Sequence, residues 1–335
     1  MNPSTLIHQY IDRNSLQVIT EKPIGDRTIQ FIYNTLRESA PTMFRVLVSG
    51  KMSSLLGYFH YDMPGKKNCG KELFNRLGAY WQECVEPPDF YDSHRKFFER
   101  QIRYWETRPM ISKSSTVVSP ADSRVLIGTF AETSTLFIKD KFFDLEELLG
   151  SESLWCSRFI GGDFAVFRLT PDKYHYNHVP VNGRVVAAYN VDGRYHSCNP
   201  SALISMASLY SKNRRVVTII DTDVEGGSLI GLVAMVEIVA LMIGDIVQSY
   251  SEERYDTPQE VFPGQMVKRG CPKSLFRPGS STVVLVFEPG RIAFADDLVK
   301  NSQRCDVESR FTSGFKRPLV ETDVQVRSSI AKPLI

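Results

Sequence analysis

The sequence predicts an α+β protein in which a helical N-terminal segment precedes a mainly antiparallel β core. Apolar residues recur every three or four positions between Phe44 and Phe59, as they do on one face of a helix. After Pro109 the chain changes to short runs rich in valine, isoleucine and phenylalanine, separated by glycine and proline. We therefore divide the chain into a helical segment, residues 1–108, and a β-rich domain, residues 109–335.

The composition is that of an ordinary globular protein. The 335 residues are 42% hydrophobic and 23% charged, which is enough apolar material for a core. Lysine and arginine number 40 against 38 acidic residues, so no overall field attracts nucleic acid and we expect no such partner. The N-terminal residues MNPSTLIHQYIDRN lack the continuous apolar stretch of a secretory signal, which favours a cytoplasmic setting.

The N-terminal apolar stripe allows two interpretations. Arg45 and Lys51 flank it, so the helix either packs on its own protein or rests as a basic amphipathic helix on a lipid surface. A second helical run is predicted from Asp92 to Trp105 and ends before Pro109.

One later stretch, Leu229 to Ile246, is almost long enough to cross a bilayer. Glu237 lies at its centre, and a carboxylate there opposes insertion into lipid. The valine and isoleucine content instead predicts buried strands. Further strands are expected in the runs TVVSPADSRVLIGTF, DFAVFRL, GRVVAAYNV, RRVVTIIDT and STVVLVFEPGRIAF.

Three local features could carry chemistry. Ser280 and Ser281 present hydroxyls on a turn before a strand, and His175 and His178 stand three residues apart before a proline. Asp122 follows an apolar run, where a turn-forming aspartate is ordinary. The histidines suit a structural pair, acid–base work or a metal, but no acidic or cysteine partner stands at ligand spacing, and we expect no metal. Together Asp122, His178 and Ser281 have the residue types of an orienting carboxylate, a general base and a nucleophile.

Beyond these local features, the chain resembles the phosphatidylserine decarboxylase proenzymes over about residues 92 to 304. Several motifs occur in the family's order, and together they are far more specific than any one of them. The motifs are HRKFFERQI, VVSPADSRV, FIKDKFFDLEELLG, FRLTPDKYHYNHVPVNGRV, YSKNRRVV and SSTVVLVFEPGRIAFADDLVKNS.

The resemblance implies a self-cleaving chain. Asp122, in the family's SPADG segment, would polarise His178, the second histidine of its YHxxH segment, and His178 would deprotonate Ser281. The Ser281 hydroxyl would attack the carbonyl of Ser280 and form an ester, and elimination would then split the chain into residues 1–280 and 281–335. Hydrolysis of the new end would release ammonia and leave a pyruvoyl group derived from Ser281 as the covalent cofactor.

The resemblance also implies a lyase that converts phosphatidylserine to phosphatidylethanolamine and CO2 in phospholipid biosynthesis. The pyruvoyl ketone would bind the substrate amine as a Schiff base and accept the electrons left by decarboxylation, and His175 would return a proton to Cα. The expected partners are a phospholipid at the membrane surface and the chain's own cleaved C-terminal fragment. The protein would then attach peripherally on the cytoplasmic side.

Three points stay open at this stage. SSTV replaces the family's usual glycine before serine, so the bond between residues 279 and 280 competes with the bond between Ser280 and Ser281, which we favour on strand register. Glu237 and the divergent N-terminal region raise two alternatives: a pyruvoyl decarboxylase of a free, aromatic amino acid, or a non-catalytic lipid-binding homologue. The sequence leaves the oligomeric state open and is compatible with a homo-oligomer.

Overall fold

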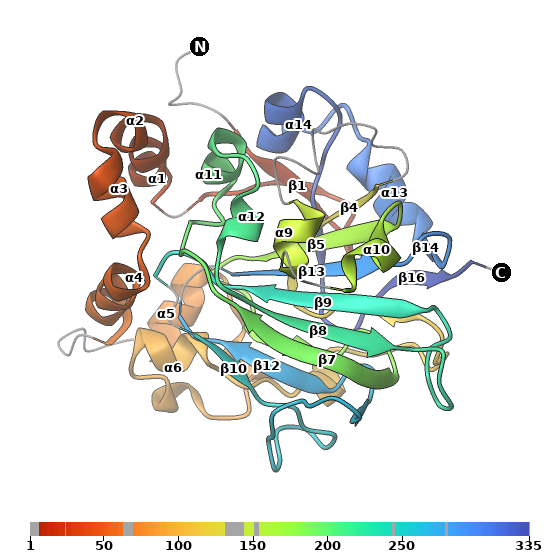
Figure 1. Ribbon diagram of the computed structural model, residues 1–335. Helices are drawn as coiled ribbons and strands as arrows, with labels where there is room; N and C mark the ends of the chain where they lie inside the picture. The colour runs from red at the N-terminus through yellow and green to blue at the C-terminus, as the bar shows by residue number, and fades with distance from the viewer. Residues whose placement is uncertain are drawn as a thin grey trace.

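The computed structural model describes residues 7–23, 25–62, 70–130, 144–150, 154–242, 245–278 and 281–334. Ser280, one side of the predicted scissile bond, lies outside the described residues, as does much of the motif FIKDKFFDLEELLG. The described residues form one large sheet, two small sheets and many short helices (Figure 1). Strands and helices both contribute, as an α+β protein requires.

The large sheet has ten strands within the described part of the chain. All neighbours are antiparallel except β1 and β15, which run parallel. In spatial order the strands are β11 (Met266–Val267), β7 (Gly183–Val191), β8 (Arg215–Asp221), β9 (Leu232–Ile238), β13 (Ser281–Phe287), β5 (Asp163–Leu169), β4 (Ser123–Thr129), β15 (Thr322–Val324), β1 (Gln9–Asp12) and β2 (Val18–Thr20).

Two three-stranded sheets complete the β structure. The first contains β10 (Ile246–Gln248), β12 (Pro272–Phe276) and β6 (Tyr176–His178), and the second contains β14 (Ile292–Phe294), β16 (Ser329–Pro333) and β3 (Val117–Val118). The α-helices are α1 (Asp26–Gln30), α2 (Arg37–Ser39), α3 (Pro41–Leu47), α4 (Gly50–Gly57), α5 (Gly70–Leu77), α6 (His94–Phe98), α7 (Tyr104–Thr107), α9 (Leu145–Leu149), α10 (Cys156–Phe159), α11 (Pro200–Ser205), α12 (Leu209–Lys212), α13 (Asp296–Ser302) and α14 (Arg310–Phe315). Two π-helical segments, Phe31–Leu36 and Tyr58–Asp62, and two 3₁₀ turns, Trp81–Glu83 and Pro88–Phe90, are also present.

The large sheet has a core on each face because successive side chains of a strand point to opposite sides. Val284 and Val286 of β13 pack in one cluster with buried residues of α9, α11 and α12. Val283 and Leu285 pack in the other cluster with Phe276 of the first small sheet. The strand β13 is therefore buried on both faces, which explains its unbroken apolar run.

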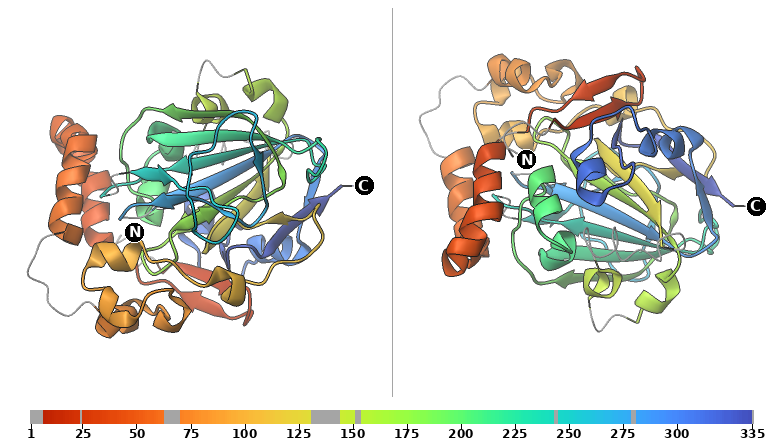
Figure 2. Two further views of the ribbon diagram at one scale, coloured as in Figure 1. Left: turned by 90° about the horizontal axis from the view of Figure 1, so that it is seen from below. Right: turned by 90° about the horizontal axis from the view of Figure 1, so that it is seen from above.

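The N-terminal segment is helical only in part. It begins with the hairpin β1–β2, which joins the large sheet and which the prediction of a largely helical segment did not include. The predicted stripe from residue 44 to 59 lies on α3, α4 and a π-helical turn. Ser49 interrupts the stripe because it caps α4: its Oγ accepts a hydrogen bond from the Met52 amide at 3.4 Å. Helices α1 to α4 stand on the side of the molecule away from the C-terminus (Figure 2).

Two other sequence predictions can be compared with the structure. The run from Asp92 to Trp105 contains only the short helices α6 and α7, because Phe97 and Phe98 both turn into the protein and the chain leaves the helix after them. Within the apolar stretch from residue 229 to 246, residues 232–238 form the buried strand β9, as predicted, and Ile246 begins β10. Among the described helices none has the length and apolar character that crossing a bilayer requires.

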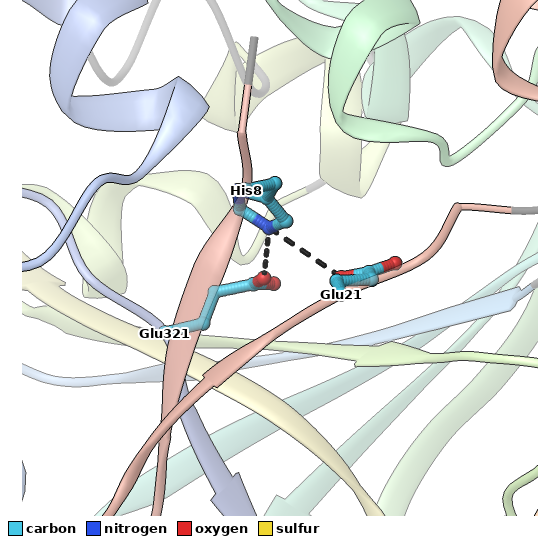
Figure 3. Close-up of side chains that lie close together, drawn as sticks. All are labelled: His8, Glu21 and Glu321. Atoms are coloured by element: carbon cyan, nitrogen blue, oxygen red, sulfur yellow. Dashed lines mark hydrogen bonds and ion pairs between the residues drawn. The ribbon is translucent and has the colours of Figure 1, made fainter. Parts of the chain in front are cut away.

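A buried ion-pair cluster fastens the N-terminal hairpin to the C-terminal part of the chain (Figure 3). His8 Nε2 lies 2.9 Å from Glu321 Oε2 and 3.5 Å from Glu21 Oε2. Arg168 bonds both carboxylates, at 2.6 Å and 2.7 Å, and Arg124 also contacts Glu21. One histidine and two carboxylates this close together resemble a metal site, but the two guanidinium groups already balance the two carboxylates. We therefore interpret the cluster as an electrostatic clasp.

Acidification is expected to weaken this clasp. Burial raises the pKa of Glu321, but the facing Arg168 outweighs it, so the pKa falls to about 2. A carboxyl in the unfolded chain titrates near 4.3, so the stabilisation is complete above about pH 4.3 and is lost as the pH falls from there toward 2. Urea unfolding of the wild type and Glu321→Gln checks this. The variant should lose about 3 to 5 kcal/mol at pH 7, and a gap that stays constant down to pH 3 would contradict the assignment.

Candidate active site

Ser281 is the first residue of β13 and lies at one end of the large sheet. Its strand runs between β5 and β9, with Ser281 opposite Leu169. The side chain is fully buried, and its Oγ has no hydrogen-bond partner among the described residues. A buried hydroxyl without a partner is rare in folded proteins and calls for an explanation, of which a reactive role is one.

Two connections between the sheets bring His175 to the same end. The chain passes from Leu169 of β5 to β6, and from Phe276 of β12 to Ser281 of β13. β5 pairs with β13, with Leu169 opposite Ser281, and β6 pairs with β12, with Tyr176 opposite Leu275. The Phe276 amide donates to the His175 carbonyl at 3.0 Å, so the backbone hydrogen bonds between β12 and the β6 segment continue as far as His175.

The His175 ring lies in the layer between the sheets. It stacks on Phe98 at 3.5 Å between ring centroids, and Phe98 belongs to the apolar cluster that also holds Leu169 and Val283. The ring is fully buried, and neither nitrogen makes a hydrogen bond of normal geometry within the described chain. Burial and the nearby Arg100 hold the pKa of His175 well below its usual range, so the imidazole is neutral near pH 7.

His178 faces the other side of β6. Its Nδ1 lies 2.8 Å from the carbonyl of Gly270, and since a carbonyl only accepts, Nδ1 carries the proton. Nε2, unprotonated in this tautomer, lies 3.0 Å from the Tyr174 hydroxyl, which also lies 2.7 Å from the Tyr255 hydroxyl, and the ring packs edge-on against Tyr104. Burial lowers the pKa of His178 to about 3, so the group is neutral. None of these contacts is with Ser281.

Asp122 is held by an arginine rather than by a histidine. Arg108 bonds both carboxylate oxygens, at 2.8 and 3.1 Å, and the Val326 amide donates to Oδ1 at 2.7 Å. Burial raises the pKa of Asp122, but Arg108 outweighs it and the carboxyl stays ionised. Asp122 makes no hydrogen bond to His178. The two segments meet through the backbone, where the His178 amide donates to the Pro120 carbonyl at 2.7 Å.

Sequence reasoning therefore missed three groups that hold the site: Arg108, Tyr174 and the Gly270 carbonyl. Tyr174 stands within the motif YHYNH, but its spacing alone does not distinguish a histidine partner from a core aromatic residue. Arg108 follows a helix and precedes a proline, which gives no signal of a buried carboxylate partner. A backbone carbonyl 92 residues away has no signature in the sequence at all.

A small cavity opens beside the connection that leads to Ser281. It has a volume of about 230 Å³, and its wall includes Tyr58, Tyr61, Met242 and Pro278. Tyr61 contacts Phe98 at 6.0 Å between ring centroids, and Phe98 in turn stacks on His175. Two ring contacts, from Tyr61 to Phe98 and from Phe98 to His175, therefore connect the wall of the cavity with the buried histidine.

Comparisons with known proteins place this geometry in a family. The family model described as phosphatidylserine decarboxylase matches residues 94–312. The chain is 31% identical to the phosphatidylserine decarboxylase proenzyme of Chlamydia trachomatis serovar L2, over 91% of this chain and 95% of that protein. The chain belongs to the phosphatidylserine decarboxylase family. The Fusobacterium nucleatum proenzyme is 29% identical over 92% of this chain and 96% of its own length, and the Ruminiclostridium cellulolyticum proenzyme is 27% identical over 88% and 92%.

Membership confirms the resemblance drawn from the motifs, and it makes the chain an enzyme of the carboxy-lyase class. The proenzyme names of its relatives in the phosphatidylserine decarboxylase family agree with a chain that matures by processing. The alternative of a non-catalytic homologue is not favoured.

Proposed function

We propose that this protein decarboxylates phosphatidylserine to phosphatidylethanolamine after it cleaves its own chain between Ser280 and Ser281. The observation that carries the proposal is the juxtaposition of two unsatisfied groups in one dry layer. The Ser281 hydroxyl and both ring nitrogens of His175 are buried without hydrogen-bond partners of normal geometry among the described residues. Leaving such groups unpaired costs about 1 to 3 kcal/mol each, so a reactive role explains why they are kept.

Self-cleavage begins at Ser281. Its Oγ is fixed at the start of a buried strand, and the carbonyl that it attacks belongs to the preceding residue, so the reacting groups are already joined. His178 is the proposed base because it is neutral and its Nε2 is unprotonated. For this step Nε2 exchanges the hydroxyl of Tyr174 for that of Ser281. Asp122 keeps the neighbouring turn in place through Arg108 and the Val326 amide.

The residues around Ser281 fit a pyruvoyl group made from that serine. Such a group supplies a ketone that accepts the substrate amine and takes up the electrons left by decarboxylation. The buried position excludes water from it. His175 is the proposed proton carrier: it is neutral at rest, so it can take a proton from the entering ammonium group and return it to Cα.

The N-terminal helices are the proposed contact with the membrane. Five apolar side chains on α3, α4 and the following π-helical turn are about half exposed or more, and Arg45 and Lys51 are exposed among them. Apolar side chains interspersed with cations suit the surface of an anionic bilayer. Residues of α4 and of the π-helical turn also line the cavity of about 230 Å³, so a lipid headgroup would enter there. The five are Met43, Val46, Leu55, Tyr58 and Phe59.

Substrate competition tests the proposed function. Purified protein should release CO2 from phosphatidylserine in detergent micelles and should release little from free serine or from aromatic amino acids. The Ser281→Ala protein is the matched control and should release none. Activity on free amino acids alone would reject the lipid assignment.

Flotation with vesicles tests the membrane contact. Wild-type protein should float with vesicles that contain phosphatidylserine, and Met43→Asp combined with Val46→Asp should reduce the bound fraction at least fivefold, by roughly 1 kcal/mol or more. Ile160→Asp is the control, because this side chain is equally exposed but follows α10. Equal binding of all three proteins would contradict the proposed surface.

A further inference from the structure

Glu237 shares a face of the large sheet with Ser281. In β9 it stands opposite Val283 of β13, and Ser281 precedes Val283 by two residues. Side chains two apart on a strand, and side chains directly opposite on neighbouring strands, point to the same face. Glu237 is therefore the diagonal neighbour of Ser281, with their Cβ atoms somewhat less than about 7 to 8 Å apart.

The Glu237 carboxylate is completely buried and fully partnered. Lys273 Nζ donates to Oε2 at 2.7 Å, and the Gln248 amide donates to the same oxygen at 3.2 Å. Ser274 Oγ and the Asn177 amide, the latter at 3.4 Å, donate to Oε1. Lys273 is equally buried and also donates to Gln248 at 2.8 Å. The Glu237 carboxylate, which lies in an apolar stretch of the sequence, is thus neutralised within the protein and is not free to bind a substrate.

These contacts hold a bulge in β12. In the pairing of β12 with β6, Pro272 stands opposite His178 and Ser274 stands opposite Asn177, so Lys273 is an extra residue. Consecutive residues of a regular strand point to opposite faces, whereas here Lys273 and Ser274 both reach Glu237. A bulge re-aims side chains and sets the register of the strands beside it. Here the neighbouring strand β6 carries His178, and His175 immediately precedes it.

Asn177 completes the link between the ion pair and the histidine strand. It lies between His175 and His178 in sequence, and its side chain bonds Ser274 Oγ at 2.9 Å in addition to Glu237. The position of β6 relative to Ser281 thus depends on the Glu237 carboxylate and on the Lys273 ammonium group that pairs with it.

We propose that Glu237 and Lys273 are positioning residues, whose buried ion pair fixes the bulge in β12 and thereby the placement of His175 and His178 relative to Ser281. The proposal rests on the proposed function of those three residues. Replacing both members of a buried ion pair with apolar residues of similar size is often neutral for stability or even stabilising. Removing both members together leaves no buried charge without a partner, so the double replacement disturbs folding less than either single one would.

The double variant Glu237→Leu with Lys273→Met provides the test. It should still fold and melt cooperatively, yet cleave itself about 10- to 100-fold more slowly, the range expected when reacting groups are misplaced by up to 1 Å. Once cleavage is complete, its kcat on phosphatidylserine micelles should fall by a similar factor with KM nearly unchanged. The matched control is Glu288→Leu with Arg158→Met, an ion pair beyond the far end of β13, which should leave cleavage and kcat unchanged.

If the double variant does not fold, Ser274→Ala decides, since it removes only one hydroxyl from the carboxylate. It should slow cleavage at least threefold in a folded protein. The proposal would be overturned if the folded double variant cleaved itself and turned over substrate at wild-type rates. If the double variant fails to fold, the same result in folded Ser274→Ala would overturn it. A wild-type protein that never cleaves would instead reject the proposed function, so the two failures are distinguishable.

Discussion

Ser281→Ala is expected to yield a single chain of 335 residues with no decarboxylase activity. Without the hydroxyl no ester forms at the preceding carbonyl, so the chain is not split and no ketone is created to accept electrons. A denaturing gel and a CO2-release assay measure both effects. The fold should survive, because Ser281 Oγ makes no hydrogen bond to any described residue that alanine would lose.

Ser280→Ala is the matched control for this prediction. It should still produce two chains, because the carbonyl of residue 280, and not its side chain, is attacked. If instead Ser280→Ala stays intact and Ser281→Ala is cleaved, the nucleophile is Ser280 and the bond between residues 279 and 280 is the one that breaks.

The second large effect separates the two histidines. His178→Asn is expected to slow self-cleavage about 10²- to 10⁴-fold, because it removes the base, and the protein should be isolated mainly as one chain. His175→Asn should be cleaved but should lose about 10²- to 10⁴-fold in kcat, because it removes the proton carrier beside the processed serine. Gels and steady-state kinetics on the same preparations distinguish the two defects.

The substitution His8→Asn is the control for this pair of variants. His8 is also buried, but it belongs to the electrostatic clasp on the N-terminal hairpin. Its replacement should lower stability without changing the ratio of cleavage to turnover. Identical defects in His175→Asn and His178→Asn would contradict the proposed division of roles.

Much of the fold could be predicted because it depends on local pattern. The apolar run after Thr282 predicted a strand preceded by a turn that holds Ser281, and β13 occupies that run but already begins at Ser281. The stretch around Glu237 predicted buried strands because a carboxylate is costly in lipid, and β9 lies within it. The N-terminal hairpin was missed because its strands have three or four residues, too few for a clear alternation.

The candidate site was predictable in its residues but not in its contacts. His175 and His178 stand out in the motif, yet only the pairing of β6 with β12 shows that they face different layers. Asp122 was expected beside His178, and it pairs instead with Arg108, a preference set by charge that spacing does not reveal. The partner of Glu237 is 36 residues away across a bulge, which no periodicity in the sequence predicts.

The central claim is that the Ser281 hydroxyl breaks its own chain and leaves a keto group in its place. The intact masses of the purified protein test this most directly. We predict two species, residues 1–280 with an ordinary carboxyl end, and residues 281–335 lighter by one ammonia than the same peptide beginning with serine. Active protein of full length, or a fragment that begins at residue 281 with a free amine, would contradict the account.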